Sequence, residues 1–172
     1  MLLSVCTRSY VDLRNMRIIE DDLSGSEIQA LLEVHFAGML ANSPQGSCHF
    51  LDVAALKGPD VTFWSIWDGG SLAGCGALKE LDREHGEVKS MRTDAAHLGR
   101  GVGAEMLTHV LRIAQERGYR RVSLETGGTE AFAAARHLYA KFGFAECGPF
   151  GDYSPDPFSV FMELELESSS LV

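Results

Sequence analysis

Cysteine is scarce in this sequence, and the few cysteines stand far apart. There are four among 172 residues, and none belongs to a C-x-x-C pair: Cys6, Cys48, Cys75 and Cys147. A structural zinc site usually draws on such close pairs, and small secreted domains rely on denser disulfide frameworks. The sequence therefore predicts no metal site and a reducing environment.

Long apolar runs are also missing. No segment approaches the roughly 20 apolar residues that a membrane-spanning helix needs. Residues 1–14 have no sustained apolar stretch of the kind found in a secretion signal. We therefore expect a cytoplasmic protein without a membrane partner. We expect residues 1–15 to form an N-terminal extension, residues 16–166 one domain and residues 167–172 a C-terminal tail.

Positive charge is in deficit as well. Fifteen lysines and arginines stand against 24 aspartates and glutamates, so the formal net charge is −9. Nucleic-acid binding depends on clustered basic residues, so this balance argues against a nucleic-acid partner. Acidic clefts steer cations, so a cationic substrate is compatible with the charge. Negative charge of this size also serves simply to keep a protein soluble.

What remains is the composition of an ordinary globular protein. Apolar residues make up 45% and charged residues 23% of the chain, which is ordinary for a packed domain. Runs of β-branched and aromatic residues, separated by turns rich in Gly and Asp, predict an antiparallel meander of three strands. These strands cover residues 61–67, 72–81 and 87–93.

Helical periodicity appears on both sides of the meander. Before it, after a strand over residues 16–20, a capping box of Ser24 and Glu27 predicts a helix that ends near Met39. After it, strands and helices alternate, which indicates a mixed sheet. The expected elements are a helix that Gly118 ends, a helix over residues 130–142 with Thr129 at its N-cap, and strands over residues 121–125, 144–148 and 159–164.

The segment from residue 87 to residue 104 carries the chemistry. It joins a strand to a helix through Gly99, Gly101 and Gly103. The first N–H groups of a helix lack partners and lie at the positive end of its dipole, so such a turn can hold a diphosphate. Glycines also serve there for tight packing alone. The turn lacks the Gly-Lys-Ser/Thr of a P-loop and the spacing of a dinucleotide-binding fingerprint.

Two motifs together resemble the GNAT acetyltransferase superfamily. Its acetyl-CoA signature corresponds to residues 98–103, and its Ala-x-x-x-Tyr-x-x-x-Gly-Phe element corresponds to Ala135, Tyr139, Gly143 and Phe144. The resemblance implies an α/β (α+β) fold with a mixed, mostly antiparallel six- to seven-stranded sheet flanked by about four helices. The sequence departs from the family at Leu98, where Gln or Arg is common, and at Phe132, where an Asn often contacts the cofactor.

The resemblance implies acetyl-CoA as co-substrate and assigns its binding residues. The strand before the glycine turn would pair with the pantetheine arm, a form of β-augmentation, and the Met91 N–H would polarise the thioester carbonyl. The N–H groups of the turn would hold the diphosphate, and Arg100 would add positive charge. The assigned residues are Met91, Arg92, Thr93, Leu98, Gly99, Arg100, Gly101, Val102, Gly103 and Ala104.

Two residues receive catalytic roles from the resemblance. Glu87 would be the general base that takes a proton from the attacking amine, although it also fits an exposed carboxylate at a strand start. Glu80 and Glu125 are rival carboxylates. Tyr139 would protonate the departing thiolate, although it also fits an aromatic residue of an amphipathic helix that packs on the sheet.

The acceptor site is expected near the loop over residues 149–158, because long loops without internal structure often carry function. Asp152 and Asp156 would receive a cationic amine and Tyr153 would pack on it. The same loop also fits a hairpin tip stiffened by proline. Residues 39–50 are expected to form the other wall of the acceptor site.

The functional hypothesis is an N-acetyltransferase that uses acetyl-CoA. The acceptor would be a primary amine of a small molecule or peptide, which attacks the thioester directly in a ternary complex. One alternative is a non-catalytic acetyl-CoA-binding sensor on the same fold, and another is a nucleotide-binding α/β protein. The sequence leaves open the acceptor's identity and whether the protein is a homodimer.

Overall fold

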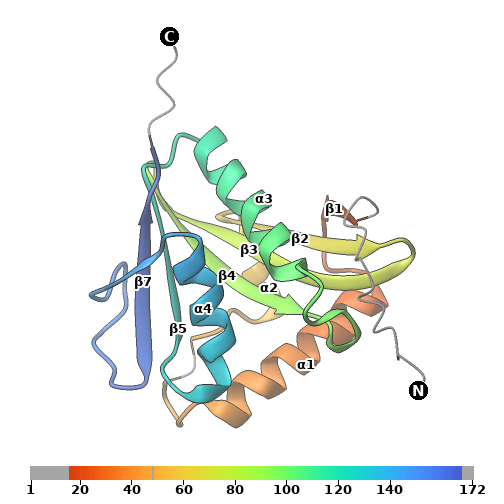
Figure 1. Ribbon diagram of the computed structural model, residues 1–172, viewed down its shortest axis with the longest axis horizontal. Helices are drawn as coiled ribbons and strands as arrows, with labels where there is room; N and C mark the ends of the chain where they lie inside the picture. The colour runs from red at the N-terminus through yellow and green to blue at the C-terminus, as the bar shows by residue number, and fades with distance from the viewer. Residues whose placement is uncertain (1–15, 48, 168–172) are drawn as a thin grey trace, which may run out of the picture.

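The structure, a computed structural model, describes residues 16–47 and 49–167, which make one seven-stranded sheet with helices on both faces (Figure 1). The expected extension over residues 1–15, the tail over residues 168–172, and Cys6 and Cys48 lie outside these residues. The elements in chain order are β1 (Met16–Glu20), α1 (Ser26–Asn42), α2 (Val53–Leu56), β2 (Val61–Asp68), β3 (Ser71–Asp82), β4 (His85–Thr93), η2 (Ala95–His97), α3 (Val102–Glu116), β5 (Arg121–Gly127), η3 (Glu130–Phe132), α4 (Ala133–Lys141), β6 (Ala145–Cys147) and β7 (Ser159–Glu165).

The strands lie in the order β1-β2-β3-β4-β5-β7-β6. β1 to β4 form an antiparallel meander, and β5, β7 and β6 pair antiparallel with one another. Only β4 and β5 are parallel neighbours, because the helix α3 crosses over between them. The predicted fold class, a mixed and mostly antiparallel sheet with flanking helices, is confirmed.

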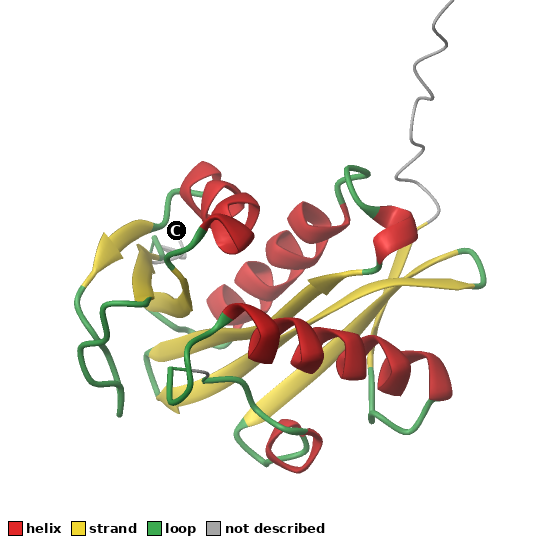
Figure 2. Cartoon of the chain, turned by 90° about the horizontal axis from the view of Figure 1, so that it is seen from below, coloured by secondary structure: helices red, strands yellow, loops and turns green. Residues whose placement is uncertain are grey.

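The helices cover the sheet from opposite sides. Figure 2 shows α1 and the short α2 on one face and α3 and α4 on the other. Alternation along the strands sends residues to both layers: Trp64 and Ile66 of β2 join the core under α3, while Phe63 joins the core under α1. Both faces of β2 and β3 are therefore buried, which explains their dense apolar sequence.

Several helix ends differ from the sequence prediction. The Ser24–Glu27 capping box does not form: Gly25 is the N-cap of α1, without a side-chain cap, and the Ser26 hydroxyl donates to the Glu27 carboxylate instead. The helix α1 also continues beyond Met39 to Asn42. Likewise, the helix expected from residue 130 starts as the 3-10 turn η3, and α4 begins only at Ala133. Short-range signals located these helices but not their ends.

The glycines expected to end helices are confirmed. Gly118 and Gly143, which follow α3 and α4, have φ angles of 79° and 94°. These left-handed conformations suit glycine, which has no Cβ to clash. Among the described residues, no helix is both long and apolar enough to cross a membrane.

Candidate active site

The site is built around an opening between the two parallel strands. β4 and β5 pair at only three positions, from His85↔Arg121 to Glu87↔Ser123. β4 then continues to Thr93 and β5 to Gly127, and Figure 1 shows the two strands diverging along these segments. The divergence leaves a gap in the centre of the sheet, and a cavity of about 210 Å³ lies there, bounded by β4, β5, α1 and α4.

A bulge in β4 lies beside this opening. The register with β3 shifts between Cys75↔Arg92 and Ala77↔Lys89, so that Ser90 and Met91 stand opposite one residue of β3. Ser90 has a φ of 52°, a left-handed conformation that is uncommon for a residue with a side chain. Bulges of this kind re-aim the following residues. Here the bulge sets the direction of Met91 and Arg92, both of which line the cavity.

The glycine turn stands at the start of α3, as the sequence predicted. Gly101 is the N-cap and has a φ of 81°, and Gly99 has a φ of 72°, so both positions favour glycine. The Arg100 guanidinium donates to the Asp68 carboxylate at 2.7 Å. This ion pair ties the turn to the end of β2, so Arg100 anchors the turn and its charge is shared with Asp68. Leu98 is largely exposed.

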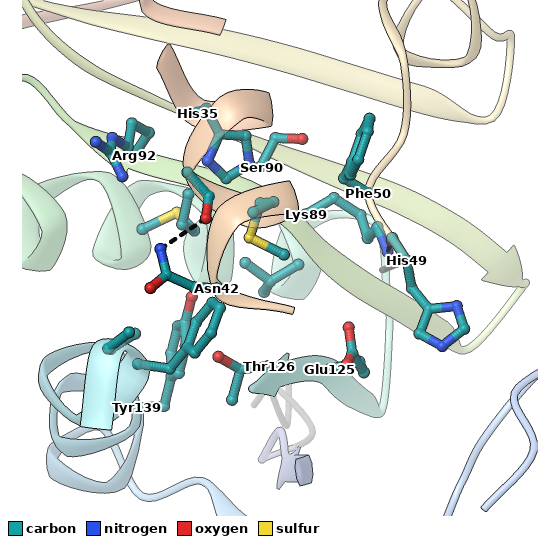
Figure 3. Close-up of a pocket in the computed structure, with 17 residues that line it drawn as sticks. His35, Asn42, His49, Phe50, Lys89, Ser90, Arg92, Glu125, Thr126 and Tyr139 are labelled. Atoms are coloured by element: carbon teal, nitrogen blue, oxygen red, sulfur yellow. Dashed lines mark hydrogen bonds between the residues drawn. The ribbon is translucent and has the colours of Figure 1, made fainter. Parts of the chain in front are cut away.

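Tyr139 reaches the cavity from α4. Figure 3 shows its ring directed from the helix toward the opening, and its side chain packs edge-on against Phe144 with ring centroids 5.8 Å apart. Tyr139 is 7% exposed. Burial raises the pKa of its phenol above the ordinary value of 10, because an apolar environment disfavours the phenolate. The hydroxyl is therefore protonated at neutral pH and available as a proton donor.

Glu87 lies on the other face of the sheet, in a buried network. It is 3% exposed, so it is not the exposed strand-start carboxylate that the sequence also allowed. Its Oε1 accepts a hydrogen bond from the Tyr153 hydroxyl at 2.6 Å and one from the Lys89 ammonium at 3.1 Å. Lys89 also donates to the Tyr153 hydroxyl at 2.7 Å and to the His49 carbonyl at 2.9 Å. All three protons of the Lys89 ammonium are thus engaged.

This network forms the wall of a second cavity. It has a volume of about 710 Å³ and is bounded by the first half of β4, the segment around His49 and the loop before β7. It shares His49, Phe50 and Lys89 with the first cavity. Gly46, His49 and Phe50, from the segment predicted to border the acceptor site, form part of its wall.

The loop residues predicted for the acceptor site lie in different settings. Tyr153 points inward to Glu87, and burial, together with the charge of that carboxylate, raises the pKa of the Tyr153 phenol. Asp152 lines the second cavity but is exposed. Asp156 also lines it, and its carboxylate accepts a hydrogen bond from the Phe158 N–H at 2.8 Å. Of the three, only Tyr153 contacts the buried network.

The two rival carboxylates differ in their position relative to the cavities. Glu80 lies on β3 and accepts a hydrogen bond from the Tyr119 hydroxyl at 2.9 Å, and it lines neither cavity. Glu125 lines the first cavity and accepts a hydrogen bond from the Ser159 hydroxyl at 2.6 Å. Phe132, at the position where the family often has Asn, also lines that cavity.

Sequence reasoning missed Lys89 and assigned no role to His35. Lys89 follows Glu87 at a spacing of two, which places both on one face of a strand, so this signal was present. His35 is 8% exposed and lines the first cavity. Burial, with smaller contributions from the charges of Arg92 and Lys89, lowers the pKa of its imidazole to about 4. The imidazole is therefore neutral at neutral pH.

Comparison with known proteins shows the family to which the chain belongs. Residues 28–144 match the acetyltransferase (GNAT) family, and the chain belongs to it. The chain is 52% identical over 151 residues to the uncharacterized N-acetyltransferase YsnE of Bacillus subtilis, covering 88% of this chain and all of YsnE. It is 53% identical over 146 residues to the uncharacterized N-acetyltransferase YedL of Escherichia coli, covering 85% of this chain and 92% of YedL.

The fold is shared with solved acetyltransferases. An acetyltransferase of Bacillus subtilis, solved in complex with CoA, superposes with a TM-score of 0.66 at 18% identity, covering 88% of this chain and 99% of that one. The chain is therefore an N-acetyltransferase that uses acetyl-CoA as co-substrate. The opening between β4 and β5 and the left-handed glycine turn fit that group, because they offer a gap for an extended arm and backbone N–H groups for a diphosphate.

Proposed function

We propose that this acetyltransferase moves the acetyl group directly to a primary amine, with both substrates bound at once. The observation that carries the proposal is that the opening between β4 and β5 is approached from both faces of the sheet. Tyr139 lines it on the α4 side, and the Glu87 network stands beside it on the side of the second cavity. Two substrates can thus meet at the opening without passing each other.

The residues of one side bind the co-substrate. The backbone of Met91 and Thr93 pairs with the extended arm as an added strand, and the Met91 N–H stabilises negative charge on the thioester oxygen. The N–H groups of residues 99–104 hold the diphosphate at the start of α3. Arg100 keeps this turn in place through its ion pair with Asp68.

The residues of the other side handle protons. An alkylamine is mostly protonated at neutral pH, so a base must deprotonate it before attack. Glu87 takes this proton, directly or through a water molecule. Its Oε1 is engaged by Tyr153 and Lys89, and within the described residues no side chain or backbone group hydrogen-bonds to Oε2, which leaves that atom for the proton. Tyr139 protonates the departing thiolate from the opposite side.

An acceptor screen tests this proposal. Purified protein is incubated with acetyl-CoA and a panel of primary amines, and free CoA thiol is measured, while calorimetry measures the affinity for acetyl-CoA. We expect thiol release that depends on one class of amine. Tight binding of acetyl-CoA without thiol release for any amine would contradict the proposal and favour the non-catalytic sensor.

A further inference from the structure

The cavity at the opening has one cationic side chain that nothing in the described chain neutralises. Lys89 is saturated by Glu87, Tyr153 and the His49 carbonyl. Arg92, by contrast, forms no ion pair with a described residue, and its Nε is buried without a hydrogen-bond partner there. The side chain as a whole is partly exposed, but a buried N–H donor is normally paired, because leaving it unsatisfied costs free energy. An unpaired one beside a cavity indicates a ligand that supplies the acceptor atoms.

The surroundings of Arg92 are shaped to admit such a ligand. Gly38 stands inside α1, in its C-terminal part, and glycine within a helix is unfavourable by about 1 kcal/mol relative to alanine. A Cβ at this position would lie 3.8 Å from Arg92 Nη1, so a larger side chain would fill the space above the guanidinium. Ser90, next to it on the bulge, also has a buried hydroxyl without a partner among the described residues.

The cavity is polarised along its length. Figure 3 shows Arg92 and His35 near one end and Glu125 at the other. His35 is kept neutral by burial and by the positive charges of Arg92 and Lys89, so it adds no competing charge at the cationic end. A molecule with an amine and an anionic group fits this gradient, because each charge meets its opposite.

We propose that Arg92 is the anion-binding residue of the acceptor site, and that the acceptor is a small primary amine that carries a carboxylate, as an amino acid does. The inference rests on the proposed function and narrows its substrate class. The guanidinium fork matches a carboxylate with two parallel hydrogen bonds. It departs from the sequence hypotheses, which assigned Arg92 to acetyl-CoA and placed a cationic amine on Asp152 and Asp156.

The test compares acceptors that carry a carboxylate with acceptors that carry an uncharged carboxamide in its place. Each standard amino acid is assayed beside its carboxamide with wild-type protein and with Arg92→Gln. We expect the free acid of at least one pair to be the better substrate. Arg92→Gln should lower kcat/KM for that acid about 10- to 100-fold, the loss expected for a charge-assisted hydrogen-bond pair, and should leave its carboxamide unchanged. Arg83→Gln, which removes an equal charge from the exposed β3–β4 turn, is the matched control.

A second variant leaves the charge in place and changes the space. Gly38→Leu should raise KM for the acid about as much as Arg92→Gln does, because the added side chain occupies the region over the guanidinium. Acetyl-CoA affinity, measured by calorimetry, should be unchanged in both variants. A fall in acetyl-CoA affinity for Arg92→Gln, with equal treatment of acid and carboxamide, would assign Arg92 to the co-substrate and overturn the inference.

A binding measurement separates this inference from the proposed function. The ring resonances of His35 are followed by NMR while L-leucine or L-leucinamide is added in the presence of CoA. A carboxylate near Arg92 should raise the pKa of His35 from about 4, because a nearby anion stabilises the imidazolium, and leucinamide should not. This result without any turnover would support the anion site and refute the catalytic proposal. If carboxamides are acetylated as fast as the free acids and the pKa of His35 does not change, the anion site is refuted but the catalytic proposal stands.

Discussion

Replacing Tyr139 with phenylalanine is the most discriminating test of the proposed chemistry. The ring stays, so its contact with Phe144 stays, and the hydroxyl forms no hydrogen bond within the described part of the chain. Removing a hydroxyl that has no protein partner costs little, so the free energy of unfolding should change by less than about 0.5 kcal/mol. General-acid assistance is worth about 10²-fold in rate, or close to 3 kcal/mol. The expected result is therefore a large loss of kcat in a protein of unchanged stability.

The assay compares two acetyl donors. With acetyl-CoA, whose alkyl thiolate leaves poorly, Tyr139→Phe should lower kcat about 10²-fold. With an acetyl aryl thioester, whose thiolate needs no proton to leave, the loss should be much smaller. Because burial raises the pKa of Tyr139, the phenol stays protonated from about pH 6 to about pH 9. The ratio of the wild-type kcat to the variant kcat should therefore stay constant over this range. Equal losses with both donors, or a clear fall in melting temperature, would make Tyr139 a packing residue.

Three other perturbations have defined outcomes. Glu87→Gln should lower kcat by about 10²-fold or more, most strongly at low pH, where more of the amine carries its proton. The affinity for acetyl-CoA should hardly change. A pH–rate profile that keeps its acidic limb would instead make Glu125 the base. Gly101→Glu should bind acetyl-CoA about tenfold or more weakly than Gly101→Ala in calorimetry. Gly101→Ala is the control, because it shares the strain of the φ of 81° but adds no charge. Equal affinities in the two variants would show that the diphosphate does not bind at this turn. His35 has a pKa of about 4 in the fold and an ordinary value near 6.5 when unfolded, so the unfolded state takes up a proton first as pH falls. Stability is thus fully present above about pH 6.5, and between pH 7 and pH 4 the wild type should lose about 3 kcal/mol more than His35→Gln in denaturant unfolding. Parallel curves for the two proteins would show that His35 titrates normally.

The architecture was predictable because its signals are local. The meander follows from alternating and apolar strands with Gly and Asp turns, and α3 follows from helical periodicity between Gly101 and Gly118. The left-handed conformations of Gly99 and Gly101 are what a glycine-rich turn between a strand and a helix implies. Helix ends were less accessible: Gly25, not Ser24, caps α1, because several neighbouring residues can cap and packing selects among them.

The candidate site likewise combines features that have local sequence signals with features that have none. The sequence by itself determined the glycine turn, the strand before it and the tyrosine of α4, because each is marked by residues close together in the chain. Only the tertiary structure decided that Tyr153, 66 residues from Glu87, bonds to its carboxylate and that Lys89 is fully engaged between them. It alone decided that Arg92 forms no ion pair with a described residue, in a chain of net charge −9. Pairing of charges depends on which segments the fold brings within a few ångströms, and a single sequence carries no local signal for such distances.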